Sequence, residues 1–372
     1  MKPHTVATLP SPLFVVLLGF LLGVPSVARP ASYTFTTIDV PAAFMSLPPR
    51  IVGVDYGPFR DGQSPDTGIF PTLDQLKADM PVLKKIAGAI RTYSTTNGLQ
   101  NIVGFADEHG LKVAPGAWLS DNATTNALET DNLITVAQQH DNVLFAVVGS
   151  EAILRFENGF PQGLSKNAVI AQINKVKANV SVPVTTAEPW HIWRDNPDLV
   201  DAVDLIFLNI LPYWEMQHID NAVSFVFAKY TEIKNKYPGK RVIISETGWP
   251  SSGNPNGPAQ PSLANQKKFI SEFLNLVRKE KIDFFYFEAF DEKWKVGEPN
   301  GVGPHWGFYF SDRTPKHSIM TLRLDRPAVD FDGDGISDIA LYRSGTWYVL
   351  RSSDNGITGV VFGGVAGDIP LN

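Results

Sequence analysis

Eight apolar stretches alternate with helical patterns between Ile51 and Ile319, and this alternation limits the possible folds more than any other feature. The apolar stretches, each of strand length, are 51–56, 89–93, 111–115, 143–149, 182–187, 205–211, 241–246 and 282–288. Between them apolar residues recur every three or four positions, as at Leu73, Leu76 and Met80, which is typical of amphipathic helices. Eight strand–helix units in about 270 residues predict an α/β protein of the (β/α)8 TIM-barrel class.

A doubly wound open sheet is the competing fold for such an alternating pattern. That fold commonly carries a glycine-rich dinucleotide-binding turn after its first strand. The sequence has Gly53-Val54-Asp55-Tyr56-Gly57 at this place instead. The barrel is therefore the favoured interpretation.

The segments before and after the barrel region differ from it in composition. Residues 1–28 predict a secretory signal peptide, because an apolar run from Leu13 to Val24 follows Lys2 and precedes small residues at 26–28. The run is short for a bilayer span, so an uncleaved membrane anchor is the less favoured alternative. We expect residues 29–49 to be a linker, 50–321 the barrel domain and 322–328 a second linker. The protein is then secreted, extracellular or periplasmic, with no membrane attachment after signal removal.

Composition excludes several classes of function. The net charge of −6 argues against nucleic acid as a partner and leaves neutral ligands open. The absence of cysteine excludes disulfides, thiolate metal sites and cysteine nucleophiles. Eight tryptophans, several near predicted strand ends, suit stacking on carbohydrate, although aromatic residues are more often core residues.

The carboxyl ends of the predicted strands carry acidic and aromatic side chains. In a TIM barrel the active site lies at these ends, so we take these residues as candidate substrate contacts. They are Tyr56, Arg91, Tyr93, Ser150, Trp190, Asn209, Tyr213, Trp214, Trp249, Glu288, Glu292, Trp294 and Lys295. Among them Arg91 is also a candidate charge partner that keeps a glutamate ionised.

Two strand-end glutamates, Glu151 after the fourth strand and Glu246 after the seventh, are the candidate catalytic residues. Glycoside hydrolysis needs one protonated carboxyl group to assist the departing oxygen and one ionised carboxylate near the anomeric carbon. Two neighbouring carboxyl groups raise each other's pKa, so one site can hold both states. A buried structural glutamate is the alternative for each.

Residues 245–251, Ser-Glu-Thr-Gly-Trp-Pro-Ser, closely resemble the nucleophile motif of glycoside hydrolase family 17, the β-1,3-glucanase-type barrel enzymes. Residues 148–151, 290–295, 305–309 and 314–316 resemble further segments of that family, and the similarity covers roughly 51–320. The resemblance implies a retaining mechanism with Glu246 as nucleophile and Glu151 as general acid and then base. It also implies a monomer that needs no cofactor for catalysis and acts on β-glucan polysaccharide or oligosaccharide.

Ser150 is a departure from the plant members of this family, which have asparagine immediately before the acid/base. The chain looks more like the bacterial and fungal branches, some of which act on other β-glucan linkages or transfer sugars. We expect an endo-β-1,3-glucanase. A transglycosylase, a β-1,6-glucanase and a non-catalytic β-glucan-binding protein are the alternatives.

The C-terminal residues 329–372 follow a different pattern. Acidic residues at alternate positions, with a backbone carbonyl at the seventh, fit a calcium loop, and the expected ligands are Asp330, Asp332, Asp334, Ile336 and Asp338. An EF-hand would need glutamate at position 12, where Leu341 stands. The segment resembles one calcium-binding repeat of extracellular β-propellers, so we expect a partial β-rich repeat with structural Ca²⁺. An acidic turn that binds nothing is the alternative.

Overall fold

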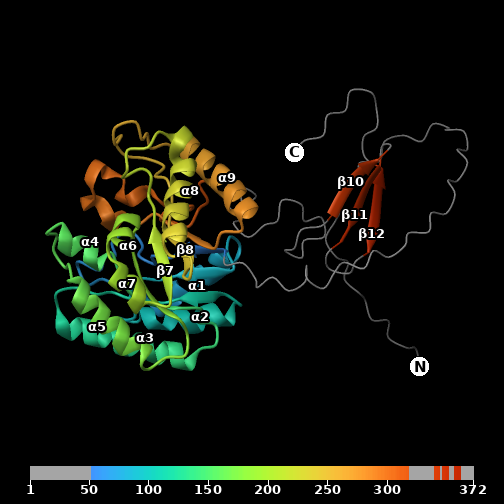
Figure 1. Ribbon diagram of the computed structural model, residues 1–372. Coiled ribbons are helices and arrows are strands. Elements are labelled where there is room, and N and C mark those ends of the chain that lie inside the picture. The colour runs from blue at the N-terminus through green and yellow to red at the C-terminus, as the bar shows by residue number, and fades with distance from the viewer. Residues whose placement is uncertain (1–51, 318–338, 344–345, 352–355, 362–372) are drawn as a thin grey trace, which may run out of the picture. The chain divides into compact units, whose positions relative to one another are not determined.

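The structure is a computed structural model that describes residues 52–317, 339–343, 346–351 and 356–361. A closed parallel barrel forms the larger part of it (Figure 1). Its strands, in chain order, are β1 (Val52–Asp55), β2 (Ala89–Arg91), β3 (Lys112–Ala114), β4 (Gly116–Ala117), β5 (Ala146–Ser150), β6 (Val184–Pro189), β7 (Leu205–Asn209), β8 (Arg241–Glu246) and β9 (Phe284–Tyr286). Their order in the sheet is β3-β2-β1-β9-β8-β7-β6-β5-β4, and every pairing is parallel. The predicted TIM-barrel class is confirmed.

The two ends of this sheet order meet at Pro115, which is the only residue between β3 and β4. β3 pairs with β2 and also bridges from Val113 to Val143, while β4 pairs with β5. Together they occupy one position in the barrel and close it. Proline has no N–H to donate, but the Pro115 carbonyl accepts the Val147 N–H at 3.0 Å. A Cβ at Gly116 would lie 2.4 Å from the Thr92 carbonyl oxygen, so this corner requires glycine.

Helices cover the outside of the barrel (Figure 1). The α-helices are α1 (Leu73–Lys84), α2 (Ile102–Glu108), α3 (Ala123–Gln139), α4 (Ala152–Glu157), α5 (Lys166–Lys177), α6 (Trp190–Asp195), α7 (Pro197–Ala202), α8 (Ile219–Lys236) and α9 (Leu263–Glu280). Short 3₁₀ turns are η2 (Leu99–Asn101), η3 (Lys293–Gly297), η4 (Pro299–Gly301) and η5 (Gly303–His305). Side chains of Thr72, Asn122 and Ser262 accept backbone N–H bonds at the starts of α1, α3 and α9, which explains where these helices begin.

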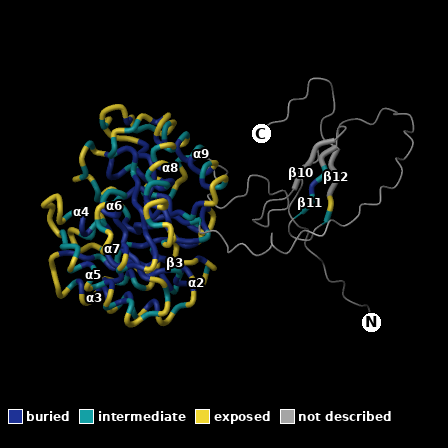
Figure 2. The backbone as a smooth tube through the Cα atoms, in the orientation of Figure 1, coloured by how far each residue is buried: buried dark blue, intermediate teal, exposed yellow. Residues whose placement is uncertain are grey.

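Two apolar clusters hold the barrel together, one inside it and one between strands and helices. Figure 2 shows that buried residues gather in the interior of this domain and exposed ones at its outside. The interior cluster includes Phe145, Phe207 and Phe285. A Cβ at Gly53 would lie within 2.3 Å of the Phe285 ring, so the glycine in β1 makes room for this side chain. The larger cluster contains the buried apolar residues of α1, α5, α8 and α9. Of the predicted apolar face of α1, Leu76 and Met80 are buried in it, whereas Leu73 is 49% exposed.

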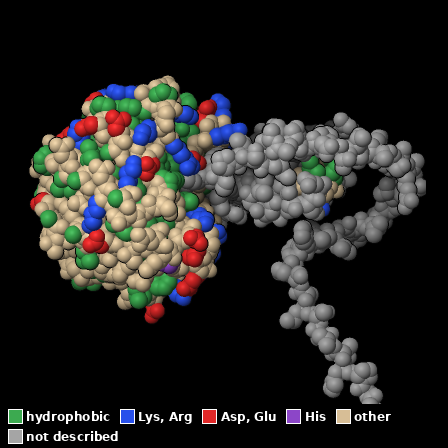
Figure 3. Space-filling view, turned by 60° about the horizontal axis from the view of Figure 1, so that its bottom comes forward, with side chains coloured by type: hydrophobic (Ala, Val, Ile, Leu, Met, Phe, Trp, Pro, Cys, Tyr) green, Lys and Arg blue, Asp and Glu red, His purple; other side chains and the backbone are tan. Residues whose placement is uncertain are grey.

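The surface of the described residues is electrically mixed. Figure 3 shows lysine and arginine interspersed with aspartate and glutamate on one face. Ion pairs at the surface of the described residues include Lys77 with Glu108 at 2.8 Å and Lys166 with Asp198 at 2.8 Å. Exposed pairs of this kind contribute little to stability.

The C-terminal strands β10 (Ile339–Arg343), β11 (Thr346–Leu350) and β12 (Ile357–Val361) form an antiparallel sheet in the order β10-β11-β12. The predicted calcium ligands Asp330, Asp332, Asp334, Ile336 and Asp338 lie outside the described residues, as do the predicted signal peptide and both linkers. In the described ranges no helix is both long and apolar enough to span a membrane. The same ranges contain no cluster of three or more histidine or acidic side chains suited to a metal ion.

Candidate active site

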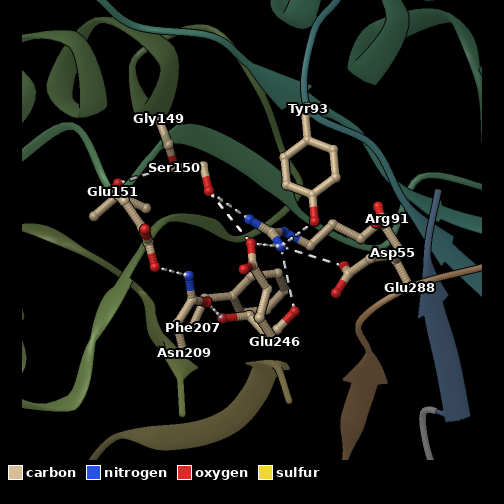
Figure 4. Close-up of polar contacts among 12 residues, drawn as sticks. Asp55, Arg91, Tyr93, Gly149, Ser150, Glu151, Phe207, Asn209, Glu246 and Glu288 are labelled. Atoms are coloured by element: carbon tan, nitrogen blue, oxygen red, sulfur yellow. Dashed lines mark hydrogen bonds and ion pairs between the residues drawn. The ribbon is translucent and has the colours of Figure 1, made fainter. Parts of the chain in front are cut away.

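Glu246 and Glu151 line one cavity of about 730 Å³ at the carboxyl ends of the strands. Glu246 is the last residue of β8, and Glu151 follows β5 directly. Figure 4 shows both carboxyl groups among the polar side chains of neighbouring strands. The two residues that the sequence singles out for catalysis are therefore brought into the same site.

Arg91 is the charge partner of Glu246. Its Nη1 atom lies 2.6 Å from Glu246 Oε1 and 3.2 Å from Asp55 Oδ1, and the guanidinium is fully buried (Figure 4). Ser150 Oγ accepts a 3.0 Å bond from Arg91 Nη2 and lies 3.4 Å from Glu246 Oε1. A guanidinium stays charged at every ordinary pH, so a fixed positive charge faces Glu246. Ser150 Oγ lies beside this ion pair and contacts both of its members.

Glu151 has the opposite environment. Burial raises the pKa of Glu151 to about 7, and the nearby negative charge of Glu246 is the second largest cause of this rise. Its one described side-chain partner is Asn209, whose Nδ2 donates to Oε1 at 2.8 Å. Ser245 Oγ donates to the Asn209 amide oxygen at 2.6 Å and so fixes which way the amide points. At neutral pH a proton is thus available on Glu151.

The backbone around Glu151 is held by β6. Glu151 has a left-handed conformation with φ of 52°, which is uncommon for a residue other than glycine. Its N–H donates to the Ala187 carbonyl at 2.7 Å. The next strand residue, Glu188, accepts the N–H groups of Ile153 and Leu154 at 2.9 and 3.2 Å. Burial raises the pKa of Glu188 to about 8.

A second ionic group lies on the β9 side of the cavity. Lys295 Nζ is 2.7 Å from Glu288 Oε2 and 2.8 Å from Glu292 Oε2. Glu292 also accepts the Phe59 N–H at 3.3 Å. A Cβ at Gly57 would lie 2.3 Å from the Glu292 carboxyl group, so a side chain at position 57 would displace this carboxylate.

These strand-end carboxyl groups and their partners lie in one barrel domain, and known proteins share it. Residues 53–307 match the family described as the BtgE/BtgC glycoside hydrolase domain. The chain belongs to this family. By this membership it is a glycoside hydrolase domain.

Several fungal proteins are similar to this BtgE/BtgC-type chain. It is 30% identical over 262 residues to a glucan 1,3-beta-glucosidase of Schizosaccharomyces pombe, covering 66% of this chain and 80% of that protein. It is 32% identical over 262 residues to the probable beta-glucosidase btgE of Aspergillus flavus, but covers only 42% of that protein.

A solved structure also resembles this domain. The glycoside hydrolase family 17 beta-1,3-glucanosyltransferase of Rhizomucor miehei matches with a TM-score of 0.62 at 29% identity, over 72% of this chain and 97% of that one. The resemblance to family 17 is confirmed. The calcium-repeat resemblance of the C-terminal segment stays a prediction.

The predicted contact residues of this BtgE/BtgC-type domain fall into three groups. Those that line the cavity with the two glutamates are Tyr56, Tyr93, Ser150, Glu292, Trp294 and Lys295. Those behind the lining that bond to it are Arg91, Asn209 and Glu288. Those outside it are Trp190, Tyr213, Trp214 and Trp249.

The structure corrects the predicted sugar contacts of Tyr213 and Trp249. Both side chains are fully buried, so neither offers a ring face to a ligand. Trp249 Nε1 donates to the Gln260 carbonyl at 3.1 Å, and the Tyr213 hydroxyl donates to the Asn254 carbonyl at 2.7 Å. These two rings are therefore part of the buried core of the barrel domain.

Trp190, Trp214 and Tyr56 are also engaged by protein. The Trp190 ring has Lys229 Nζ at 3.6 Å from its centroid and Arg194 at 4.8 Å. Trp214 packs on Tyr213 at 4.9 Å between ring centroids. The Tyr56 hydroxyl donates to Asp79 at 3.0 Å, so this fully buried side chain is tied to α1 although it borders the cavity.

Several residues of the site are not among the predicted contacts, and Asp55, Trp118, Glu129 and Arg155 matter most for its geometry. Asp55 binds Arg91, and the other three line the cavity. Asp55 and Trp118 could have been found, because they lie at or just beyond predicted strand ends. Glu129 and Arg155 lie in helices, and nothing in their local sequence indicates that they reach the site.

Proposed function

We propose that the chain is a secreted retaining glycosidase that cleaves β-1,3-linked glucan within its chains. The observation that carries this proposal is the contrast between the two glutamates of one cavity. Glu246 faces the fixed charge of Arg91, whereas Glu151 has a pKa of about 7 and an amide donor as its partner. Names of relatives that act on 1,3-β-glucan support the substrate class.

The reaction would proceed by double displacement. A Glu246 carboxylate oxygen forms a bond to the anomeric carbon while the glycosidic bond breaks, and the Glu151 proton moves to the departing oxygen. A water molecule then attacks the same carbon, gives its proton to Glu151 and releases Glu246. The covalent intermediate can instead accept a sugar hydroxyl, which lengthens a chain.

Product analysis tests the proposal. Purified protein is incubated with laminari-oligosaccharides and followed by proton NMR from the first minutes. Shorter products with β-configured new ends are expected. An α-configured first product contradicts the double displacement, and longer products would make the enzyme a transferase. No product on β-1,3-glucan but cleavage of β-1,6-glucan would overturn the linkage.

A binding protein without activity is the competing proposal from another class. Binding alone has no need for both glutamates with their separate partners. Retention of the protein on insoluble glucan with no release of reducing ends would favour a binding protein over a glycosidase.

We also propose that the chain is secreted as a monomer and that residues 330–338 hold structural Ca²⁺. The apolar segment at 13–24 supports secretion, and the spacing of the acidic residues supports the calcium site. Calorimetry of the full chain with CaCl₂, before and after Asp332→Ala and Asp334→Ala, tests the calcium site. Unchanged heats in the variant would reject it.

A further inference from the structure

Trp118 stands in the cavity wall, between β4 and α3, with its ring held in a fixed orientation. The Arg155 guanidinium lies 4.3 Å from the ring centroid. The indole Nε1 donates to Gln162 Oε1 at 3.2 Å. The side chain is still partly exposed, so the surface that Arg155 leaves uncovered is open to a ligand in the cavity.

Glu129 fixes the backbone beneath this ring. Its carboxylate, on the buried face of α3, accepts the Trp118 N–H at 3.2 Å and the Thr95 N–H at 2.8 Å. It also accepts the hydroxyl groups of Ser94 and Thr96 at 2.5 and 2.6 Å. One carboxylate thus joins the loop after β2 to the segment after β4, and both segments line the cavity.

Arg155 connects the Trp118 ring to the catalytic acid. Its Nη1 donates to the Ser150 carbonyl at 2.7 Å, and its Nη2 donates to the Leu119 carbonyl at 2.9 Å. Ser150 immediately precedes Glu151, and Leu119 immediately follows Trp118. The ring and the acid are therefore held at a constant spacing by one guanidinium.

We propose that Trp118 is a stacking platform for a glucosyl unit other than the one attacked by Glu246, with Arg155 and Glu129 as its positioning residues. This inference rests on the proposed function, because it assigns a further part of the same substrate. A pyranose has a flat apolar face that packs on an indole ring, and its hydroxyl groups point sideways toward polar partners. The polar lining beside Trp118, including Asn97, Ser120 and Asn122, offers such partners.

The test compares substrates of different length. Values of kcat/KM are measured for an aryl β-glucoside, which has one sugar, and for laminarihexaose. For Trp118→Ala we expect the ratio of hexaose to aryl glucoside to fall about tenfold, the size of a lost aromatic contact. Trp118→Phe keeps a ring and should recover most of the ratio. Glu129→Gln should lower the same ratio, chiefly through KM for the hexaose.

Phe225→Ala is the matched control, since it removes an aromatic ring from the outer helix α8, away from the cavity lining. Its ratio should equal that of the unmodified protein. An unchanged ratio in Trp118→Ala, or equal losses on both substrates, overturns the platform while leaving the proposed function in place.

A binding measurement separates the two proposals. Calorimetry with laminarihexaose is carried out on Glu246→Gln protein, with and without Trp118→Ala. Weaker binding in the double variant supports the platform even if the unmodified protein shows no turnover. Equal binding in both counts against it.

Discussion

Asn209 donates a hydrogen bond of 2.8 Å from its side-chain amide to Glu151, and this contact limits how far the pKa of the candidate acid rises. The bond stabilises the ionised carboxylate and therefore lowers the pKa of Glu151. Loss of water contact and the charge of Glu246 act in the opposite direction and outweigh it. The resulting value of about 7 allows Glu151 to give and take a proton near neutral pH.

Asn209→Ala should therefore raise the pKa of Glu151 further. Since the acid must be protonated in the first step, the basic limb of the kcat/KM profile should move to higher pH. The maximum rate should fall by roughly ten- to a hundredfold because the carboxyl group loses its orientation. Ser245→Ala leaves the donor in place and should shift the limb less. A basic limb that moves to lower pH would contradict the assignment of Glu151 as the acid.

Glu246→Gln should abolish turnover, with a loss of at least about a thousandfold in kcat, because the amide cannot form the glycosyl intermediate. It should also lower the pKa of Glu151, since it removes the neighbouring negative charge. Carbon NMR of labelled glutamate would follow that titration directly. Glu272→Gln, which changes a pair with Lys268 on α9, is the control and should alter neither quantity.

Glu188→Gln should change how stability depends on pH. Burial raises the pKa of Glu188 from its ordinary 4.5 to about 8, so the folded protein keeps this proton longer than the unfolded chain does. The stability that results is present below about pH 4.5 and is lost as pH rises toward 8. The variant cannot titrate there, so its free energy of unfolding should fall less between pH 5 and pH 8.

Urea unfolding at these two pH values measures the difference, expected to be on the order of a few kcal/mol. Part of the slope should persist, because Glu151 titrates in the same range. Glu157→Gln, at an exposed position of α4, the helix whose Ile153 and Leu154 N–H groups bind Glu188, should leave the slope unchanged.

The sequence predicts the barrel because buried strands and amphipathic helices have different apolar periods, and those periods repeat regularly along the chain. It also identifies Glu151, Glu246 and Arg91, since strand ends converge at one rim of a barrel. It does not show which way a side chain at a strand end points. Trp249 therefore could not be distinguished from a contact residue, although its ring is buried.

Contacts between distant segments escape sequence reasoning for a related reason. Arg155 reaches Trp118 from the helix after β5, and Glu129 reaches it from α3. Each lies in an ordinary helical pattern, and only the closure of the barrel brings them together. The same holds for Asp79, a charged residue on the buried face of α1.

Asp79→Asn should destabilise the fold more than any exposed charge change. Asp79 is 1% exposed and lies 2.6 Å from Arg60, 2.8 Å from Arg313 and 3.0 Å from the Tyr56 hydroxyl. Removal of its charge leaves two arginines without their common partner, so we expect a loss of about 3 kcal/mol in unfolding free energy. Asp198→Asn removes a surface partner of Lys166 and should cost less than about 1 kcal/mol. Equal midpoints for the two variants in urea would show that the buried cluster does not hold α1 to the loop after β1 and to the segment near Arg313.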